Sequence, residues 1–464
     1  MTQLMRCPFC GLLQDEPIGV KECSRCGGGL EYEIILPGKP TYLRVQMELD
    51  QVSAPANQNL ERYLLVTIKT PKEVPQEEAV QTDVERPGVN FTAVLDISGS
   101  MQGEKIEQAK IAVQHAIQYL RDGDAFSLVT FASEVDIPFE PCLVDQETYR
   151  AVENTLLKTY AGGVTALDLG LATGLEKAAI LPKDSNLVML LSDGQANVGE
   201  TDLEKIGHRA FQARQQGDLV SCLGIGLDYN EALLAEIATQ GGGRFYHLQN
   251  ASQIPAYLVG ELGEVAMLAA RDVKINLRLP NGATLIPLSA AYPVQQAGGQ
   301  AVVTVGDIPC DVDLEIPLRL AILAQPGGSR LSIEGKLAFH SPVGHDIGCP
   351  VNRVTVRFVT PGAFELRQGV IQPTAERVFI QLKAAQILEV SRLLATSPNT
   401  ADQQAQTIVN RLQAYADLLG EGRANEEMNA VNAQFTSLSA SPAAAKQTVA
   451  NAYHLIRSTK DFNS

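Results

Sequence analysis

Three side chains with oxygen donors stand at alternate positions directly after an apolar segment. Asp96, Ser98 and Ser100 follow residues 89–95, and a helical pattern begins at Glu104. A buried strand would carry one carboxylate and two hydroxyls into the turn before a helix, where open α/β sheets bind ligands. Such donors suit a hard divalent cation, so the pattern predicts a site for Mg²⁺, with Mn²⁺ or Ca²⁺ as alternatives.

Two later segments supply further oxygen donors. Thr165 follows Gly162 and Gly163 before another helical pattern, and Asp193 follows the apolar strand pattern of residues 186–191. Asp, Ser and Gly are also ordinary turn and capping residues, so the first three donors alone could be a helix N-cap. Thr165 and Asp193, each at the mouth of a later strand, favour the metal site over that alternative.

The order Asp-x-Ser-x-Ser, then Thr, then Asp resembles the metal-ion-dependent adhesion site of von Willebrand factor A domains. The resemblance implies a site made of Asp96, Ser98, Ser100, Thr165 and Asp193. It implies that the three hydroxyls bind the cation directly and that the two carboxylates act mainly through coordinated water. It also implies a partner protein that presents an Asp or Glu to the open position of the cation. Val164, directly before Thr165, is a small departure from the family's loop that leaves the hydroxyl in place.

Four cysteines near the N-terminus form two Cys-x-x-Cys-Gly pairs: Cys7, Cys10, Cys23 and Cys26. Two thiolates three positions apart hold one side of a tetrahedral metal, and a second pair closes the site. The pattern resembles a zinc ribbon, which we expect over residues 1–38 with Zn²⁺ bound by the four thiolates. The alternatives are two disulfides, which the lack of a secretory signal disfavours, and a rubredoxin-like iron site, although nothing else suggests electron transfer.

Residues 89–268 alternate between strand and helix patterns. Strands are predicted over 89–95, 126–131, 186–191, 219–225 and 244–248, and helices over 105–120, 146–158, 166–180, 201–215, 230–240 and 252–268. This alternation predicts an α/β, doubly wound, mainly parallel sheet of the Rossmann-like kind, which matches the fold of von Willebrand factor A domains. No glycine-rich dinucleotide motif follows the first strand, so a nucleotide-binding domain is disfavoured.

Segments with a period of two residues flank the α/β segment. They occupy residues 41–70 and 271–362, and residues 71–88, rich in Pro, Glu and Gln, are typical of a linker. Too few strands precede the α/β segment for a sandwich of their own. We therefore expect one antiparallel β-sandwich into which the α/β domain is inserted. Residues 371–460 have helical spacing and predict a C-terminal helical bundle, whose apolar faces form a core or, alternatively, bind a partner.

The chain of 464 residues carries a net charge of -16 and 45% hydrophobic residues. An acidic surface repels phosphate backbones and anionic membranes, so we expect no binding to nucleic acid. We also expect no membrane span, because no apolar stretch is long enough, and the N-terminus lacks a signal-peptide pattern. These features predict a cytoplasmic protein. The domain combination resembles bacterial multidomain proteins that contain a von Willebrand factor A domain.

The expected function follows from the metal motif. No histidine in the motif segments could activate Ser98 or Ser100 as a nucleophile, so we expect no enzyme activity. The chain is expected to be a metal-ion-dependent scaffold for protein–protein interaction. The family resemblance alone suggests an AAA+ ATPase of the MoxR or chelatase type as partner. The alternatives are a metal-dependent hydrolase that uses the same residues, and a structural protein whose metal site is vestigial.

Overall fold

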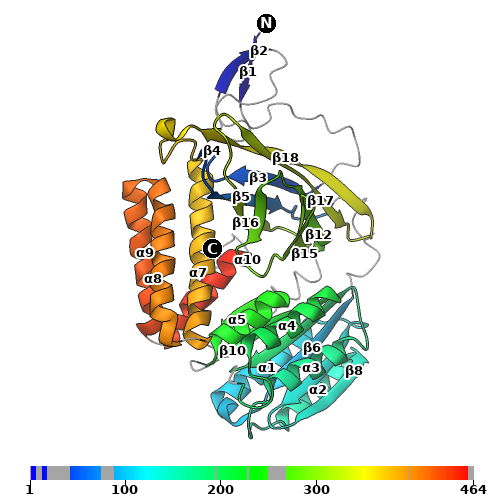
Figure 1. Cartoon of the computed structure of the whole chain (residues 1–464). Coiled ribbons are helices and arrows are strands. Elements are labelled where there is room, and N and C mark those ends of the chain that lie inside the picture. The colour runs from blue at the N-terminus through cyan, green and yellow to red at the C-terminus, as the bar shows by residue number, and fades with distance from the viewer. Residues whose placement is uncertain are drawn as a thin grey trace.

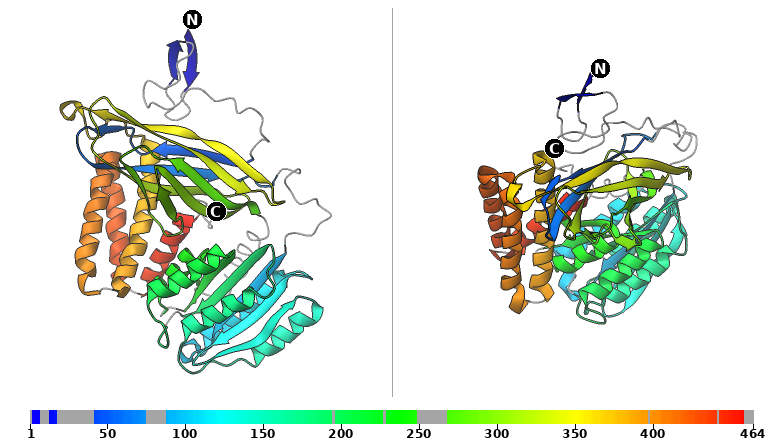
Figure 2. Two further views of the ribbon diagram at one scale, coloured as in Figure 1. Left: turned by 45° about the vertical axis from the view of Figure 1, so that its right-hand side comes forward. Right: turned by 45° about the horizontal axis from the view of Figure 1, so that its top comes forward.

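The computed structural model describes residues 2–6, 13–17, 42–74, 88–193, 196–226, 229–248, 268–396, 398–440 and 442–457. Within these ranges the chain forms an α/β domain, two stacked β-sheets and a group of long helices (Figure 1). The α/β domain lies at one end of the molecule. The long helices stand beside the two sheets and extend toward the α/β domain (Figure 2).

A six-stranded sheet forms the centre of the α/β domain. Its strands, in spatial order, are β11 (Gly242–Leu248), β10 (Asp218–Ile225), β9 (Ser185–Ser192), β6 (Val89–Asp96), β7 (Ala125–Phe131) and β8 (Val135–Leu143). All neighbours are parallel except the antiparallel pair of β7 and β8. The predicted doubly wound sheet is thus confirmed. β6 lies between β7 and β9, so its carboxyl end is the switch point at which such sheets bind ligands.

Burial distinguishes the central strands from the edge strand that the sequence analysis missed. Every residue of β6 and β7 is buried, as expected for parallel strands covered on both faces. β8 instead alternates between half-buried and exposed residues. It contains Pro138 and Pro141, which lower the strand signal in the sequence but are tolerated at a sheet edge, where a missing N–H breaks no ladder.

Five helices of the α/β domain cover the two faces of this sheet in the described residues. They are α1 (Glu104–Tyr119), α2 (Gln146–Leu157), α3 (Leu167–Ala178), α4 (Leu203–Gln215) and α5 (Glu231–Gln240). Apolar residues of α1 and α2 pack with one face of the sheet, whereas those of α3, α4 and α5 pack with the other. These helices agree with the predicted ranges. They place the connections that carry the candidate site at the carboxyl edge of the sheet.

Two further sheets combine segments from both sides of the α/β domain. One contains β14 (Val294–Ala297), β15 (Gln300–Pro309), β12 (Leu268–Arg278), β17 (Arg330–His340), β18 (Asp346–Val359) and β4 (Ser53–Pro55), and the other contains β13 (Ala283–Pro287), β16 (Asp313–Ile322), β5 (Leu60–Lys69) and β3 (Arg44–Leu49). β5 pairs along its whole length with β16. The second flank was expected from residue 271, and β12 runs from Leu268, which pairs with Pro309.

Four long helices follow the sheets: α7 (Gln372–Thr396), α8 (Pro398–Ala416), α9 (Glu421–Ala440) and α10 (Pro442–Arg457). α8 and α10 begin at prolines, which fit the first helical turn because its N–H groups have no helical partner. Arg377 of α7 joins the four-stranded sheet through Glu48 at 2.8 Å and Glu315 at 2.5 Å. No helix in the described ranges has the length and apolar content that a membrane crossing requires.

The N-terminal strands β1 (Thr2–Arg6) and β2 (Leu13–Pro17) form an antiparallel pair in which Arg6 lies opposite Leu13. The four cysteines of the expected zinc ribbon, Cys7, Cys10, Cys23 and Cys26, lie outside the described residues. The Zn²⁺ site over residues 1–38 therefore stays a prediction. The same holds for most of the linker expected at 71–88 and for the helix expected at 252–268.

Candidate metal site

Asp96 is the last residue of β6 and is fully buried. Its Oδ1 accepts a hydrogen bond from the backbone N–H of Ser98 at 2.8 Å. Its Oδ2 accepts one from the hydroxyl of Ser192, the last residue of the neighbouring strand β9, at 2.5 Å. Two strands of the sheet thus hold this carboxylate in one orientation at the carboxyl edge.

The hydroxyls of Ser98 and Ser100 lie side by side in the short helix η1 (Gly99–Met101) and the residue before it. Their Oγ atoms are 3.0 Å apart. Adjacent ligands of an octahedral Mg²⁺, each about 2.1 Å from the ion and at right angles, are also about 3.0 Å apart. The spacing of the two hydroxyls therefore fits two neighbouring positions around such a cation.

Backbone hydrogen bonds join this turn to the loop that carries Thr165. Gly99 N–H donates to Gly163 O at 3.0 Å, and Gly162 N–H donates to Ile97 O at 2.7 Å. Gly163 has a φ of +86°, and a Cβ there would lie 2.7 Å from Ser133 Oγ. That contact is with the turn between β7 and β8, so a side chain at position 163 would strain the loop against this turn. At Gly99 a Cβ would lie 3.1 Å from Gly163 O, so the close approach of the two loops is favoured by glycine there.

Thr165 is buried and is held from the far side by the loop that follows Asp193. Its backbone N–H donates to Asn197 Oδ1 at 2.7 Å, and its carbonyl oxygen accepts from Asn197 N–H at 3.2 Å. Hydrogen bonds thus join the three segments that carry the five predicted ligands. Val164, the departure from the family's loop, is 45% exposed and does not displace the threonine from the core.

Asp193 follows β9 and is also fully buried. Its Oδ2 accepts a hydrogen bond from Lys105 Nζ at 3.2 Å, and its backbone oxygen accepts one from Asn230 N–H at 3.0 Å. Its Oδ1 is buried and has no hydrogen-bond partner among the described residues. A buried carboxylate oxygen without a partner is unfavourable, so this atom calls for a cation or a cation's water.

The electrostatics of the site favour a cation. Burial raises the pKa of Asp96, and the nearby charge of Asp193 raises it further, while hydrogen bonds from Ser192 and Ser98 act in the opposite direction. Two carboxylates and the ammonium of Lys105 leave a charge of about -1 in a buried place. A divalent cation would relieve the repulsion, and the oxygen donors match the hard ions Mg²⁺, Mn²⁺ and Ca²⁺.

The sequence analysis missed three residues that support the site. Ser192 and Asn197 orient Asp96 and the Thr165 loop, and Lys105 contacts Asp193. Ser192 could have been noticed as a polar residue at the end of an apolar strand. The partners of Asn197 and Lys105 are 32 and 88 residues away in the chain, so sequence spacing gives no signal for them.

The described histidines do not supply a base for the candidate site. The hydroxyl of Ser98 pairs with that of Ser100, and no described histidine is hydrogen-bonded to either serine. His247 lies buried in β11, where burial lowers its pKa to about 4. His454 of α10 is half-buried, and desolvation likewise lowers its pKa to about 4. Both are neutral at neutral pH and belong to the packing between α10 and the α/β domain.

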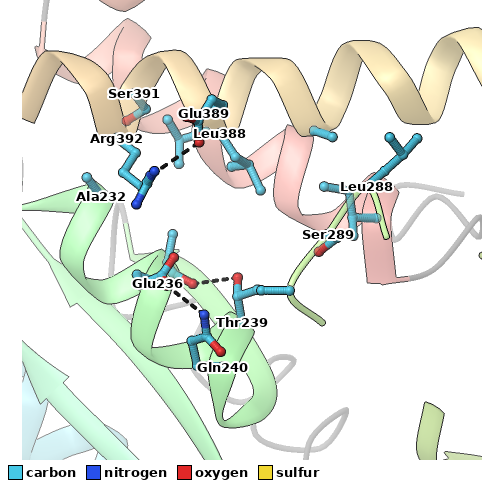
Figure 3. Close-up of a pocket in the computed structure, with 15 residues that line it drawn as sticks. Ala232, Glu236, Thr239, Gln240, Leu288, Ser289, Leu388, Glu389, Ser391 and Arg392 are labelled. Atoms are coloured by element: carbon cyan, nitrogen blue, oxygen red, sulfur yellow. Dashed lines mark hydrogen bonds and ion pairs between the residues drawn. The ribbon is translucent and has the colours of Figure 1, made fainter. Parts of the chain in front are cut away.

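A cavity of about 240 Å³ lies away from the metal site, between α5, α7, α10 and residues 288–290 (Figure 3). Several of its polar side chains already have partners. Arg392 donates to Glu389 at 3.2 Å, and Gln240 donates to Glu236 at 2.8 Å. Figure 3 shows these pairs on opposite walls of the cavity. The cavity marks a junction between the α/β domain, a sheet connection and the long helices.

Comparison with known proteins identifies the α/β domain. The family model of the von Willebrand factor type A domain matches residues 90–259. The uncharacterized protein YfbK of Escherichia coli K12 is 27% identical over 52% of this chain and 40% of its own length. Inter-alpha-trypsin inhibitor heavy chain H4 of Bos taurus is 35% identical over 33% of this chain and 18% of its own length. The chain thus spans less than half the length of either relative.

Two solved structures resemble the chain over most of its length. The von Willebrand factor type A protein from Catenulispora acidiphila has a TM-score of 0.60 and 16% identity, over 92% of this chain and 99% of that one. The ArnB paralog VWA2 from Sulfolobus acidocaldarius has a TM-score of 0.54 and 18% identity, over 90% of this chain and 100% of that one. At such identities these likenesses show a shared fold.

Proposed function

We propose that this chain is a metal-ion-dependent scaffold that binds a partner protein through its von Willebrand factor type A domain. The proposal is carried by two features at the carboxyl ends of the neighbouring strands β9 and β6. The Oδ1 of Asp193 is buried without a partner among the described residues, and the hydroxyls of Ser98 and Ser100 are paired. Bound Mg²⁺, or Mn²⁺ or Ca²⁺ in its place, supplies an open coordination position for an Asp or Glu of the partner.

The proposed ligands have two different roles in binding the cation. The hydroxyls of Ser98, Ser100 and Thr165 are neutral ligands and therefore leave most of the positive charge uncompensated. Asp96 and Asp193 bear the negative charge but accept hydrogen bonds from Ser98 N–H, Ser192 and Lys105. These hydrogen bonds partly neutralise the two carboxylates, so the carboxylates compensate less of the cation's positive charge. The cation therefore still attracts a carboxylate from the partner.

Exposed apolar side chains near the site offer a second means of recognition. Tyr160 is 78% exposed, Val164 is 45% exposed and Val198 is 38% exposed. Val164 precedes Thr165, and Val198 N–H donates to Thr165 O, so both lie beside the proposed ligand. We call these three side chains the apolar rim. A partner segment with an apolar residue beside its Asp or Glu would bury this surface while its carboxylate reaches the site.

The proposal extends to the other domains, the cellular location and the class of partner. The chain is proposed to be a bacterial-type cytoplasmic protein, with the von Willebrand factor type A domain inserted in a β-sandwich of residues 41–70 and 271–362. Residues 1–38 would bind Zn²⁺ through the four cysteines, and the helices of residues 371–460 would offer a further docking surface. An AAA+ ATPase of the MoxR type is the proposed class of partner. A metal-dependent hydrolase is the second candidate, supported by the paired carboxylates of Asp96 and Asp193.

The test is affinity capture from native lysate with Mg²⁺, with EDTA, and with Asp96→Ala in Mg²⁺. Asp122→Ala is the matched control, since Asp122 is exposed in the turn before β7, at the opposite edge of the sheet. We expect a partner held by wild type and by Asp122→Ala in Mg²⁺, and lost in the other two arms. The Asp96→Ala arm separates this loss from any removal of Zn²⁺ by EDTA. A partner retained in every arm would move the interaction away from the metal site.

A further inference from the structure

Lys105 reaches the metal site from the first turn of α1. Its Nζ lies 3.2 Å from Asp193 Oδ2, and its side chain is 18% exposed while that of Asp193 is 0% exposed. The pair joins a residue after β6 to a residue after β9, and thus links the two sides of the site. A partly buried ion pair in this position is far less screened by water than a surface pair.

The lysine and a bound cation would use different oxygens of the same carboxylate. Lys105 is bonded to Oδ2, whereas Oδ1 is buried without a hydrogen-bond partner in the described part of the chain. The two interactions are therefore compatible. The backbone of Asp193 is held separately, through its oxygen and Asn230 N–H, so the lysine acts on the side chain alone.

We propose that Lys105 is a positioning residue of the metal site, which holds Asp193 by its outer oxygen so that Oδ1 faces the cation. This inference rests on the proposed metal site and deepens it. Without the lysine, the carboxylate is free to turn, and its inner oxygen no longer has a fixed direction. Partners that orient the groups around a metal in this way typically contribute about 10- to 100-fold to metal affinity.

Lys105 also sets the net charge of the loaded site. The two carboxylates and a divalent cation sum to zero, and the ammonium brings the total to about +1. A positive site attracts a carboxylate from a partner, even though the whole chain carries a charge of -16. The opposite role, in which Lys105 competes with the cation, would make the cation bind more tightly once the lysine is removed. The sign of the change therefore distinguishes positioning from competition.

Calorimetric titration of Mg²⁺ into the full chain tests the inference. We expect Lys105→Met to weaken Mg²⁺ binding by about 10- to 100-fold and Lys105→Arg to bind Mg²⁺ more tightly than Lys105→Met. Lys110→Met is the matched control, because Lys110 lies on the same helix and pairs with Glu107 at 2.9 Å, outside the site. Mg²⁺ binding by Lys110→Met should equal that of wild type. If both methionine variants lost the same affinity, or if Lys105→Met bound Mg²⁺ as tightly as wild type or more tightly, the positioning role of Lys105 would be overturned. The proposed metal site would not be affected by these outcomes.

A double-mutant cycle with Asp193→Asn separates positioning from a general loss of stability. If Lys105 acts through Asp193, Lys105→Met should reduce Mg²⁺ affinity much less in the Asp193→Asn background than in wild type. Full additivity of the two losses would contradict the inference. Wild-type protein that binds no Mg²⁺ in calorimetry and in equilibrium dialysis would overturn the proposed metal site itself. Circular dichroism of each variant checks that the fold is intact.

Discussion

Asp96 and Asp193 show how the same residue type can differ in what surrounds it. Both are fully buried at the carboxyl edge of the sheet. The oxygens of Asp96 both accept hydrogen bonds from the protein, whereas one oxygen of Asp193 has no partner in the described residues. In the proposed metal site, one carboxylate would be fixed in advance, and the other would keep an oxygen for the metal's hydration shell.

The buried carboxyl group of Asp218, which lies outside the candidate site, should make the stability of the protein depend on pH. Burial alone raises its pKa from 3.8 to about 6. The folded state therefore holds a proton more tightly than the unfolded state, and this residue's contribution to stability falls as pH rises from about 4 to about 6. We expect Asp218→Asn, which cannot ionise, to raise the free energy of unfolding at pH 8 by on the order of 1 kcal/mol and to change it little at pH 4. Thermal unfolding at the two pH values measures the difference.

Asp122→Asn is the control for this comparison, because Asp122 is an exposed aspartate of the same domain. It should change the unfolding temperature equally little at both pH values. A gain for Asp218→Asn that is the same at pH 4 and pH 8 would show that the ionisation of Asp218 does not limit stability.

At the scale of elements, the site depends on how closely α3 packs against the sheet. Gly170 and Gly174 face β7 and β6, and a Cβ at Gly174 would lie 2.2 Å from Val94 Cγ2. Val94 is fully buried and branched at Cβ, so it cannot move away. The Thr165 loop leads directly into α3. The distance between α3 and the sheet therefore fixes the position of Thr165 relative to the other proposed ligands.

Gly174→Ala should therefore destabilise the protein although alanine is the better helix former. We expect the free energy of unfolding to fall by about 1–3 kcal/mol, because overpacking outweighs the gain in helix propensity. Gly422→Ala is the matched control: Gly422 lies in α9, and a Cβ there would meet nothing within 4 Å. Because Gly422 is in the first turn of α9, the substitution should change the free energy of unfolding by less than about 0.5 kcal/mol. Chemical denaturation of both variants measures the effects, and a stable Gly174→Ala would mean that α3 can shift without loss.

A substitution in the loops at the carboxyl edge should be able to weaken partner binding without weakening metal binding. Replacing the apolar rim, Tyr160, Val164 and Val198, by serine should leave Mg²⁺ affinity unchanged, since these side chains carry no proposed ligand. Capture of the partner should fall by at least about tenfold because the buried apolar surface is lost. Calorimetry measures the first quantity, and quantitative pull-down measures the second.

Leu143→Ser with Ile180→Ser is the control for the rim variant. These residues are 53% and 54% exposed and lie toward the amino edge of the same sheet. Partner capture should not change in this control. If it fell as much as in the rim variant, general surface hydrophobicity rather than the rim would explain the loss.

At the scale of the molecule, α10 joins the end of the chain to the α/β domain. Lys446 is 3% exposed, and its Nζ donates to Tyr229 O at 2.9 Å and to Glu231 at 3.1 Å. The next residue after Tyr229 is Asn230, whose N–H donates to Asp193 O. A short series of contacts thus connects the C-terminal helix with the proposed ligand Asp193. Tyr453 of α10 adds a hydrogen bond to Gly243 O at 2.7 Å.

Lys446→Met should loosen this connection. Removing a buried ammonium leaves Glu231 and the Tyr229 carbonyl without their partner, so we expect a loss of stability of about 1–3 kcal/mol. Hydrogen exchange should become faster in residues 442–457 and 229–240. Lys205→Met is the control, because its pair with Glu200 lies at the surface, and it should leave both exchange and unfolding temperature unchanged. Unchanged exchange in α10 of Lys446→Met would show that other contacts suffice to dock it.

The sequence by itself determined the candidate ligands and the α/β domain. Asp96, Ser98, Ser100, Thr165 and Asp193 stand at strand ends that local patterns reveal, because buried parallel strands are continuous apolar runs and turns favour small polar residues. Helix starts at Pro398 and Pro442 could also be predicted, since proline is compatible with only the first helical turn. The edge strand β8 could not, because its prolines obscure the strand pattern.

Only the tertiary structure decided which distant residues meet. The pairing of β5 with β16, the contact of Lys105 with Asp193 and the docking of Lys446 on Tyr229 join residues that are 88 or more positions apart. Such contacts arise from the burial of whole faces and from the need of buried charges for partners, and neither leaves a pattern in local spacing. Asp193 Oδ1, which has no partner in the described part of the chain, belongs to the same class, because its surroundings exist only after the strands have assembled.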